Sequence, residues 1–461
     1  MVERISHWNR ELVRWLEPFL KRLGHKARRR MCPLYIAGLI GPGERKSVQP
    51  MAERLAPGEY DQLHHFVAAG VWDAAPLAAE LLVQADRLVG GHDAVLVIDD
   101  TALPKKGRHS VGVAAQYASA LGKTANCQTL VSTTLANGEV PVMVGLRLFL
   151  PESWTTAPAG MARARVPAER QAFHSKPEIA IEEVDRVRAS GVRFGCVLAD
   201  AGYGLSAAFR HALSERGLHW AVGIPRHQKV YPVNVALIFP IAGRGRPRQR
   251  HIPDSKSLAA EVMLAGAAWR TLTWRRGTKG RLSARFAALR VRIADGPTQR
   301  IHTLGGQHMP GDEAWLIGER RASGERKYYL SNLPTDTPIK ALARTVKARW
   351  ICEQAHQQLK EELGLDHFEG RSWHGLHRHA LMTMIAYAFL LHHRFGIAKR
   401  EKKSRHTTAT AKPACDPSRH HRSYTPRNAK TMPTLSHLVQ LGVARSAKVV
   451  LDQSPFRLTV P

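Results

Sequence analysis

Cysteine is scarce in this sequence and is never paired. The 461 residues contain five cysteines, an odd number, and no Cys-x-x-Cys motif. This usage argues against a disulfide framework and against structural zinc, and it favours a reducing cytoplasm. The cysteines stand far apart, at Cys32, Cys127, Cys196, Cys352 and Cys415.

Long hydrophobic runs are also missing. No stretch approaches the roughly eighteen consecutive apolar residues of a membrane-spanning helix. Residues 1–4 do not lead into the hydrophobic segment that a signal peptide requires. We therefore expect no membrane partner.

Acidic residues are few compared with basic ones. Lys and Arg number 68 against 38 Asp and Glu, which gives a formal charge of +30 and an isoelectric point near 10.5. Such an excess favours polyanionic partners, bound with strong salt dependence through counterion release. Because 44% of the residues are hydrophobic, the chain is not a disordered basic tail. We expect a cytoplasmic, nucleoid-associated protein with room for about two to four domains.

Three of the acidic positions stand where a metal-dependent nuclease would need them. Asp99 and Asp100 follow the apolar run at residues 94–98, and Asp200 follows the apolar run at 194–199. Short apolar runs of this kind are typical of buried strands, and α/β sheets place their chemistry at the carboxyl ends of strands. Two such carboxylates and one from a helix can hold a pair of divalent cations for phosphodiester chemistry.

Glu353 provides the third position, in a helical pattern over residues 341–363. Arg349 lies four residues before it, about 40° of net rotation, and Lys360 lies eleven residues after Arg349, about 20° of net rotation. The three side chains therefore share one face, which suits a site for metal and phosphate. A solvated face with i,i+4 ion pairs is the alternative. The two strand-end aspartates favour the first interpretation.

Residues 1–90 are predicted to be helical. An apolar stripe at helical spacing comes first, and further helices are expected near 48–55 and 61–69. A basic run at 25–30 contains Arg28, Arg29 and Arg30, which we assign to general DNA grip. The charge favours a DNA-binding domain, although helical packing alone does not require one.

Residues 91–225 alternate between strand and helix patterns. The order of three strands, helix, strand, helix and strand matches a ribonuclease H-like core, in which the helix of Glu353, within 336–395, would come last. The fold class is therefore α/β, with a mixed sheet. Strands are expected at 94–99, 126–135, 140–149, 194–199 and 219–224, and helices at 177–190 and 205–216.

Residues 226–335 are predicted to form a β-rich insertion before the last core helix, with strands near 288–293 and 328–331. In the loop at 274–280, Trp274 is expected to stack on a base while Arg275 and Lys279 grip phosphates; an ordinary basic hairpin is the alternative. Residues 396–461 are read as a basic C-terminal arm, weakly ordered or disordered.

Together these residues resemble a known family. The chain is similar to the DDE transposases of bacterial insertion sequences, in the cut-and-paste branch with a Tyr-x2-Arg-x3-Glu-x6-Lys signature. Arg349, Glu353 and Lys360 match at both spacings, whereas Val346 stands at the tyrosine position. The resemblance covers about 90–395 and includes the segments 98–101, 198–204 and 364–371.

The resemblance implies a site with two Mg²⁺ ions, or Mn²⁺ as the alternative, held by Asp100, Asp200 and Glu353. Asp100 is preferred to Asp99 because Thr101 follows it directly, but a pattern with one residue between Asp and Thr would select Asp99. Only one of the two should face the metals, because side chains alternate along a strand. Arg349 and Lys360 would hold phosphates beside the scissile bond.

The implied function is transposition of the protein's own element, by cutting the element ends and joining them to target DNA. The expected partners are double-stranded DNA, as terminal inverted repeats and target, and a second copy of the chain on that DNA. Two alternatives stay open. One is a ribonuclease H-like nuclease without strand transfer, and the other is an inactivated transposase that acts as a DNA-binding protein.

Two further motifs do not support functional assignments. Residues 41–47 hint at a P-loop but lack the glycine before the lysine and a preceding strand. His374, His377 and His379 have no cysteine at zinc spacing, so we expect them to cap or pack a helix at 377–393.

Overall fold

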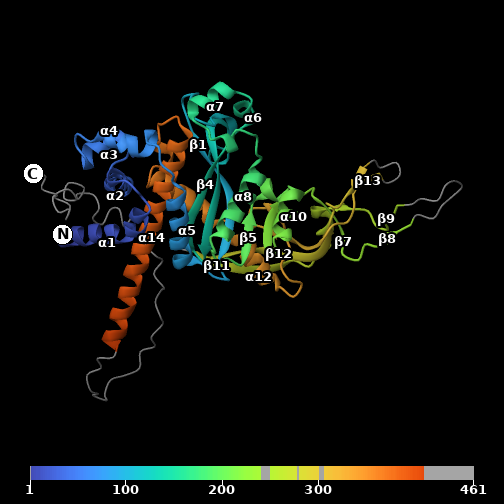
Figure 1. The fold of residues 1–461 in the computed structure, drawn as a ribbon. Helices are drawn as coiled ribbons and strands as arrows, with labels where there is room; N and C mark the ends of the chain where they lie inside the picture. Colours follow the sequence, from blue (N-terminus) through green and yellow to red (C-terminus); the bar gives the residue numbers. More distant parts are fainter. Residues whose placement is uncertain (1, 240–249, 278–279, 301–305, 410–461) are drawn as a thin grey trace, which may run out of the picture.

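The fold is taken from a computed structural model that describes residues 2–239, 250–277, 280–300 and 306–409 (Figure 1). Lys279 and most of the predicted C-terminal arm lie outside the described residues. Among the described residues, no helix combines the length and apolarity needed to cross a bilayer.

The centre of the molecule is a mixed sheet in the order β4-β3-β1-β5-β6. β1 pairs antiparallel with β3 and parallel with β5, and β5 pairs parallel with β6. This is the ribonuclease H-like arrangement, so the predicted α/β fold class is confirmed. The strands are β1 (Val95–Pro104), β3 (Lys123–Asn137), β4 (Val140–Phe149), β5 (Cys196–Ala199) and β6 (Trp220–Ile224).

Helices cover both faces of this sheet because its strands are apolar on both sides. Leu96, Ile98 and Val197 face a cluster that includes residues of α8 (Lys176–Ala189) and α10 (Ala207–Glu215). On the other face, Val97 and Leu198 pack with residues of α12 (Ile339–Ala348) and α13 (Ile351–Glu361). The two clusters show which way each side chain of β1 and β5 points.

The β-rich insertion continues the same sheet beyond β6. Its strands add in the order β16, β15, β12, β7 and β10, all antiparallel, and β11 pairs with β12. The distal elements project from the far end of the molecule (Figure 1). The elements are β7 (Lys229–Pro232), β8 (Leu237–Ile238), β9 (Ile252–Pro253), β10 (Leu258–Ala259), α11 (Ala260–Met263), β11 (Arg270–Gly277), β12 (Gly280–Ile293), β13 (Thr298–Arg300), β14 (Gly306–His308), β15 (Glu313–Arg320) and β16 (Arg326–Ser331).

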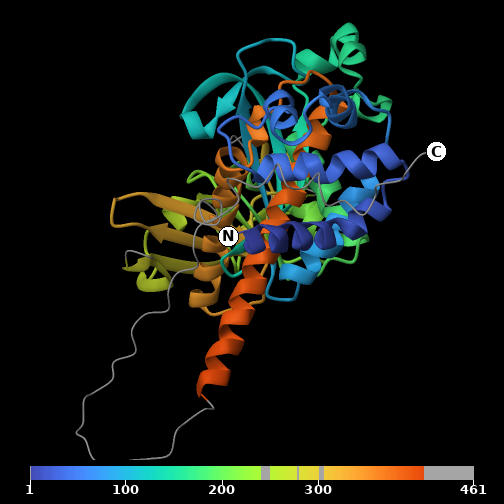
Figure 2. The same cartoon turned by 90° about the vertical axis from the view of Figure 1, so that its left-hand side faces the viewer.

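The N-terminal helices gather around the long helix α14 (Trp373–Ala409) and share the main hydrophobic core with the central sheet (Figures 1 and 2). They are α1 (Val2–Lys21), α2 (Lys26–Ile40), α3 (Val48–Leu55), α4 (Tyr60–His64), the π-helical turn η1 (His65–Ala69) and α5 (Ala75–Val89). The remaining elements are β2 (Ala114–Ala118), η2 (Ser119–Leu121), α6 (Glu152–Thr155), α7 (Pro158–Ala164), η3 (Ala168–Arg170), α9 (Ala201–Gly204) and η5 (Leu365–His367).

Two histidines of α14 pack this helix against its neighbours, as the sequence predicted. His379 accepts a hydrogen bond from the Tyr35 hydroxyl at 2.8 Å and donates to the Gly364 carbonyl at 3.0 Å. His377 donates to its own helix and accepts from the Leu148 amide at 3.3 Å. Burial lowers the pKa of His379 to about 4 and that of His377 to about 3. Both rings are therefore neutral in the folded protein.

This neutrality predicts acid sensitivity. Between pH 6.5 and about pH 4, His379 is protonated in the unfolded chain but neutral in the folded protein, because folding lowers its pKa from 6.5 to about 4. Stability is therefore fully present above pH 6.5 and falls as the pH drops toward 4. We expect the unfolding temperature to fall over this range. His379→Gln, which cannot titrate, should show a shallower fall; an identical pH slope in the two proteins would contradict the prediction.

Candidate active site

Asp99 and Asp200 stand side by side where the pairing of β1 with β5 ends. Asp99 lies in the middle of β1, which continues to Pro104 and is longer than the strand predicted at 94–99, and Asp200 directly follows β5. The parallel register pairs Ile98 with Ala199, so the next residues on the two strands lie at the same level. Because side chains alternate, Asp99 shares the face of Val97, and Asp200 shares the face of Leu198. This is the face that α12 and α13 cover.

The contacts of Asp99 show that α13 lies directly over this part of β1. Asp99 is buried and forms an ion pair with Arg349, and the Cys352 thiol lies 3.0 Å from its Oδ2 atom. The Ser132 hydroxyl donates to the Asp99 carbonyl at 3.0 Å and accepts from His356 of α13 at 2.8 Å. Burial lowers the pKa of His356 to about 4, so this histidine is a neutral donor.

Asp200 has two roles at once. Its carboxylate caps α9 by accepting from the amides of Gly202 at 3.0 Å and Tyr203 at 3.3 Å. Burial, and then the charge of Asp99, raise the pKa of Asp200 above its usual value. A carboxylate whose ionised form is disfavoured by burial and a neighbouring charge is a common property of functional sites.

Glu353 reaches the same place from the first turn of α13. Its side chain is 63% exposed and pairs with Arg349 at 3.0 Å. The helix predicted at 341–363 is interrupted after Ala348, but Arg349 and Trp350 keep helical dihedral angles, so Arg349 and Glu353 remain one turn apart. The guanidinium of Arg349 therefore bridges Asp99 and Glu353.

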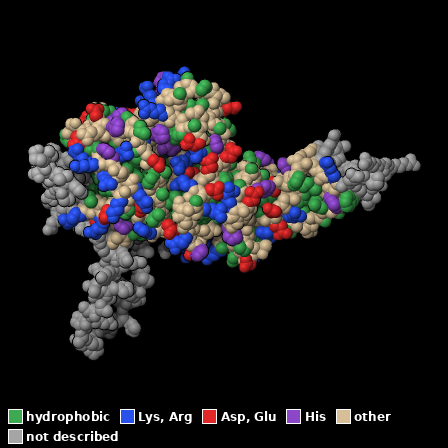
Figure 3. Space-filling model, viewed as in Figure 1, with side chains coloured by type: hydrophobic (Ala, Val, Ile, Leu, Met, Phe, Trp, Pro, Cys, Tyr) green, Lys and Arg blue, Asp and Glu red, His purple; other side chains and the backbone are tan. Residues whose placement is uncertain are grey.

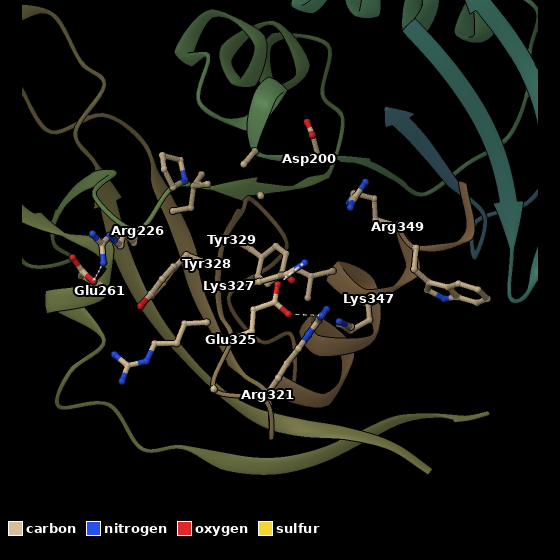
Figure 4. A pocket seen from close by; sticks show the side chains of 18 of the residues that line it. Asp200, Arg226, Glu261, Arg321, Glu325, Lys327, Tyr328, Tyr329, Lys347 and Arg349 are labelled. Carbon is tan, nitrogen blue, oxygen red and sulfur yellow. Dashed lines mark hydrogen bonds and ion pairs between the residues drawn. The ribbon is translucent and has the colours of Figure 1, made fainter. Parts of the chain in front are cut away.

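A cavity of about 840 Å³ opens in front of these residues. Asp200, Arg349 and Glu353 line its core side, together with Trp350. The opposite wall belongs to the insertion and to α12, and Figure 4 shows its charged side chains gathered across from Asp200. They include Arg226, Glu261, Arg321, Glu325, Lys327 and Lys347.

Glu319 organises part of this wall and was not foreseen from the sequence. It is fully buried in β15, and it accepts hydrogen bonds from Lys347 at 2.8 Å, Arg321 at 2.9 Å and the Tyr329 hydroxyl at 2.7 Å. Burial opposes its ionisation, but these bonds prevail and lower the pKa of Glu319. The sequence offers only a weak signal, a glutamate that follows the apolar run at 314–317.

Asp100 and Lys360 lie away from the cavity. Asp100 points to the opposite face of the sheet, where it accepts from the Tyr203 hydroxyl and pairs with Lys176. Lys360 donates to the Ala102 carbonyl of β1 at 2.9 Å, and burial lowers its pKa. Neither residue lines the cavity, whereas both were predicted to act at the catalytic centre.

Several residues predicted to contact DNA bond within the protein. The Trp274 ring lies against Phe286, and the Lys347 ammonium lies 4.7 Å from the centre of the Trp274 ring. Arg275 pairs with Glu139 at 2.6 Å and stacks over the ring of Trp350. In α2, Arg28 and Arg29 donate to the carbonyls of Val71 and Leu23, and Arg30 pairs with Glu59.

The donor set fits a hard divalent cation. Asp99, Asp200 and Glu353 offer only carboxylate oxygens, which Mg²⁺ and Mn²⁺ prefer. The pKa of Asp200 is raised, and a cation at this position would lower it by stabilising the ionised carboxylate. Within the described residues, no three His, Cys, Asp or Glu side chains are grouped closely enough to hold an ion in the present arrangement. Arg349 supplies the positive charge there.

Two protein families and one known relative match this chain. A family described as DDE superfamily endonuclease matches residues 18–281, and the transposase DDE domain matches 176–389. The probable transposase for insertion sequence element IS701 of Microchaete diplosiphon is 30% identical over 192 residues, or 41% of this chain. The match spans only 46% of that relative.

A solved structure, the cryo-EM structure of the piggyBac transposase synaptic complex with hairpin DNA, aligns over 86% of this chain and 74% of that chain. Its sequence identity is 10% and its TM-score is 0.39. The DDE superfamily endonuclease match covers more than half of the sequence. The chain therefore belongs to the DDE superfamily endonucleases.

Proposed function

We propose that this protein cuts the ends of its own mobile element and joins them to target DNA. The observation that carries the proposal is that Asp200, Arg349 and Glu353 line one cavity on a face of a ribonuclease H-like sheet, where Arg349 pairs with both Glu353 and Asp99. The family of the chain and its excess of basic residues give further support.

In this proposal Asp99, Asp200 and Glu353 hold two Mg²⁺ ions, with Mn²⁺ as the alternative. The geometry favours Asp99 over Asp100, which was preferred on sequence, because only Asp99 shares a face with the other two acids. The ions would activate the attacking oxygen and stabilise the leaving oxygen. Arg349 would hold a phosphate oxygen beside the scissile bond, since a guanidinium binds phosphate through paired hydrogen bonds.

The proposed partners are double-stranded DNA, as terminal inverted repeats and target, and a second copy of the chain bound to that DNA. Lys and Arg side chains gather over the N-terminal helices and α7 (Figure 3). Exposed examples are Arg10, Arg14, Lys26 and Arg163. We assign DNA grip to this surface, because phosphate contacts by exposed cations supply most non-specific affinity.

A strand-transfer assay tests the proposal. Purified protein would be incubated with Mg²⁺, a labelled duplex that ends in the candidate terminal repeat, and a supercoiled target plasmid. The expected result is cleavage at the repeat end and label joined to the plasmid. Cleavage without joining would indicate a nuclease. DNA binding without cleavage, in Mg²⁺ and in Mn²⁺, would indicate an inactivated transposase.

We expect substitutions of Arg349 and Lys360 to have different effects, which are measured by DNA cleavage and by the salt dependence of DNA binding. We expect Arg349→Ala to slow single-turnover cleavage at saturating protein by about a hundredfold to a thousandfold, the usual cost of removing one donor to the transition state. Lys360→Met should leave the salt slope of DNA binding unchanged, because Lys360 bonds to a backbone carbonyl away from the cavity. A slope lower by about one unit in Lys360→Met would instead identify a phosphate contact.

A further inference from the structure

The opposite face of β1 carries a second acidic site whose purpose the proposed chemistry does not explain. Asp100 follows Asp99 directly, yet its carboxylate points away from the cavity. One oxygen accepts from the Tyr203 hydroxyl and the other pairs with Lys176, at the start of α8. Asp100 is therefore bound to α8 and to α9, the helix that Asp200 caps.

Tyr203 connects this pair to the catalytic carboxylates. It is a buried residue of α9, the short helix whose first turn Asp200 caps. Its own amide donates to the Asp200 carboxylate at 3.3 Å, while its hydroxyl donates to Asp100. One side chain thus joins the middle of β1 to the turn that carries Asp200.

A glycine contact holds α9 from another side. A Cβ atom at Gly204 would lie 1.9 Å from the Gly223 carbonyl oxygen of β6, so only glycine allows α9 to approach that strand so closely. Against β6 the helix is held by this close packing. Against β1 it is held by the bond between Tyr203 and Asp100. Loss of the second contact would leave the turn free to move along β1.

We propose that Asp100 is a positioning residue: through Tyr203 it fixes the turn of Asp200 against β1, and so sets the spacing between Asp200 and Asp99 for cation binding. The inference rests on the proposed function. Two neighbouring carboxylates repel each other, so a tie from the far side of the sheet maintains a spacing that their own charges oppose. Pre-set ligands bind a cation more tightly, because less ordering is left for the binding step.

The test is Mn²⁺ binding by the DNA-free protein, measured from the electron paramagnetic resonance signal of unbound Mn²⁺. We expect Asp100→Asn and Tyr203→Phe each to weaken Mn²⁺ binding by about tenfold, the lower end for residues that orient metal ligands. The double variant should lose no more than the larger single loss, because both changes break one contact. Asp99→Asn should lose the binding altogether.

Cleavage provides a second readout. Asp100→Asn and Tyr203→Phe should reach the wild-type maximum rate, but at a metal concentration about tenfold higher. Tyr231→Phe is the matched control, since it removes a buried hydroxyl that donates to the His308 carbonyl at 2.8 Å, far along the insertion. It should change neither readout. Thermal unfolding without metal shows whether each variant is folded.

Two outcomes would overturn the inference. If Asp100→Asn loses Mn²⁺ binding as fully as Asp99→Asn does, Asp100 is itself a ligand. If Asp100→Asn and Tyr203→Phe both bind Mn²⁺ like the wild type, the contact has only a structural role. Failure of the proposed function would look different, because the wild type would bind Mn²⁺ and yet cut no DNA, and the Mn²⁺ comparison would still decide the role of Asp100.

Discussion

Asp200→Asn is expected to lower single-turnover DNA cleavage by several orders of magnitude while DNA binding persists. Asp200 is one of two neighbouring carboxylates in the proposed site, and a metal-dependent phosphodiester reaction depends on such ligands. Asparagine can still accept the hydrogen bonds from Gly202 and Tyr203, because it caps helices about as well as aspartate. The substitution therefore removes the charge and keeps the local fold.

The metal-free stability of this variant provides an internal control. Burial, and then Asp99, raise the pKa of Asp200 in the folded protein, so its ionised form opposes folding above that pKa. The neutral side chain in Asp200→Asn escapes this cost at pH 7. We expect the variant without metal to unfold at the same temperature as the wild type or higher. The difference should shrink as the pH falls and Asp200 becomes protonated.

The measurements are cleavage at saturating protein, DNA affinity and thermal unfolding, each compared with Asp73→Asn. Asp73 also accepts a hydrogen bond from a backbone amide at the start of a helix, that of Ala75 in α5 at 2.9 Å, but it lies outside the cavity. Asp73→Asn should cleave normally. Glu353→Gln should lose cleavage like Asp200→Asn, with little change in stability, because its side chain is 63% exposed. Wild-type cleavage by either cavity variant would refute the assignment of the site.

The core elements were predictable because their signals are local. The strand expected at 140–149 is β4 over the same residues, since its apolar run ends at turn residues on both sides. The helix expected at 177–190 is α8, one residue earlier, because Ser175 and Glu178 form a capping box around Pro177. Such signals depend on neighbouring residues and survive without tertiary information.

The choice between Asp99 and Asp100 was not predictable in this way. Alternation along β1 shows that the two side chains point to opposite faces but not which face carries α13. The packing of α13 on the Val97 face of β1, by residues about 250 positions later in the chain, places Asp99 rather than Asp100 beside Arg349. The contacts of Trp274 and Arg28 also join residues that are far apart in the sequence. The sequence alone therefore does not distinguish a basic or aromatic residue that is available to DNA from one that packs inside the protein.

A buried ion pair links the insertion to the core, and we expect its loss to lower the free energy of unfolding strongly. Arg210 of α10 and Asp295, just after β12, lie 2.6 Å apart with side chains 1% and 4% exposed. We expect Asp295→Ala to lower the free energy of unfolding by about 3–5 kcal/mol, because it leaves the guanidinium buried without its counter-charge. Chemical denaturation monitored by circular dichroism measures the change.

A surface pair and a double variant separate this explanation from a general loss of charge. Glu313→Ala breaks the pair with Arg290, whose glutamate is 53% exposed, and should cost less than about 1 kcal/mol. Arg210→Met combined with Asp295→Leu removes both charges, so it should recover most of the stability lost in Asp295→Ala. If the double variant is as unstable as Asp295→Ala, the unpaired guanidinium is not the cause. The loss would then come from packing between α10 and the insertion.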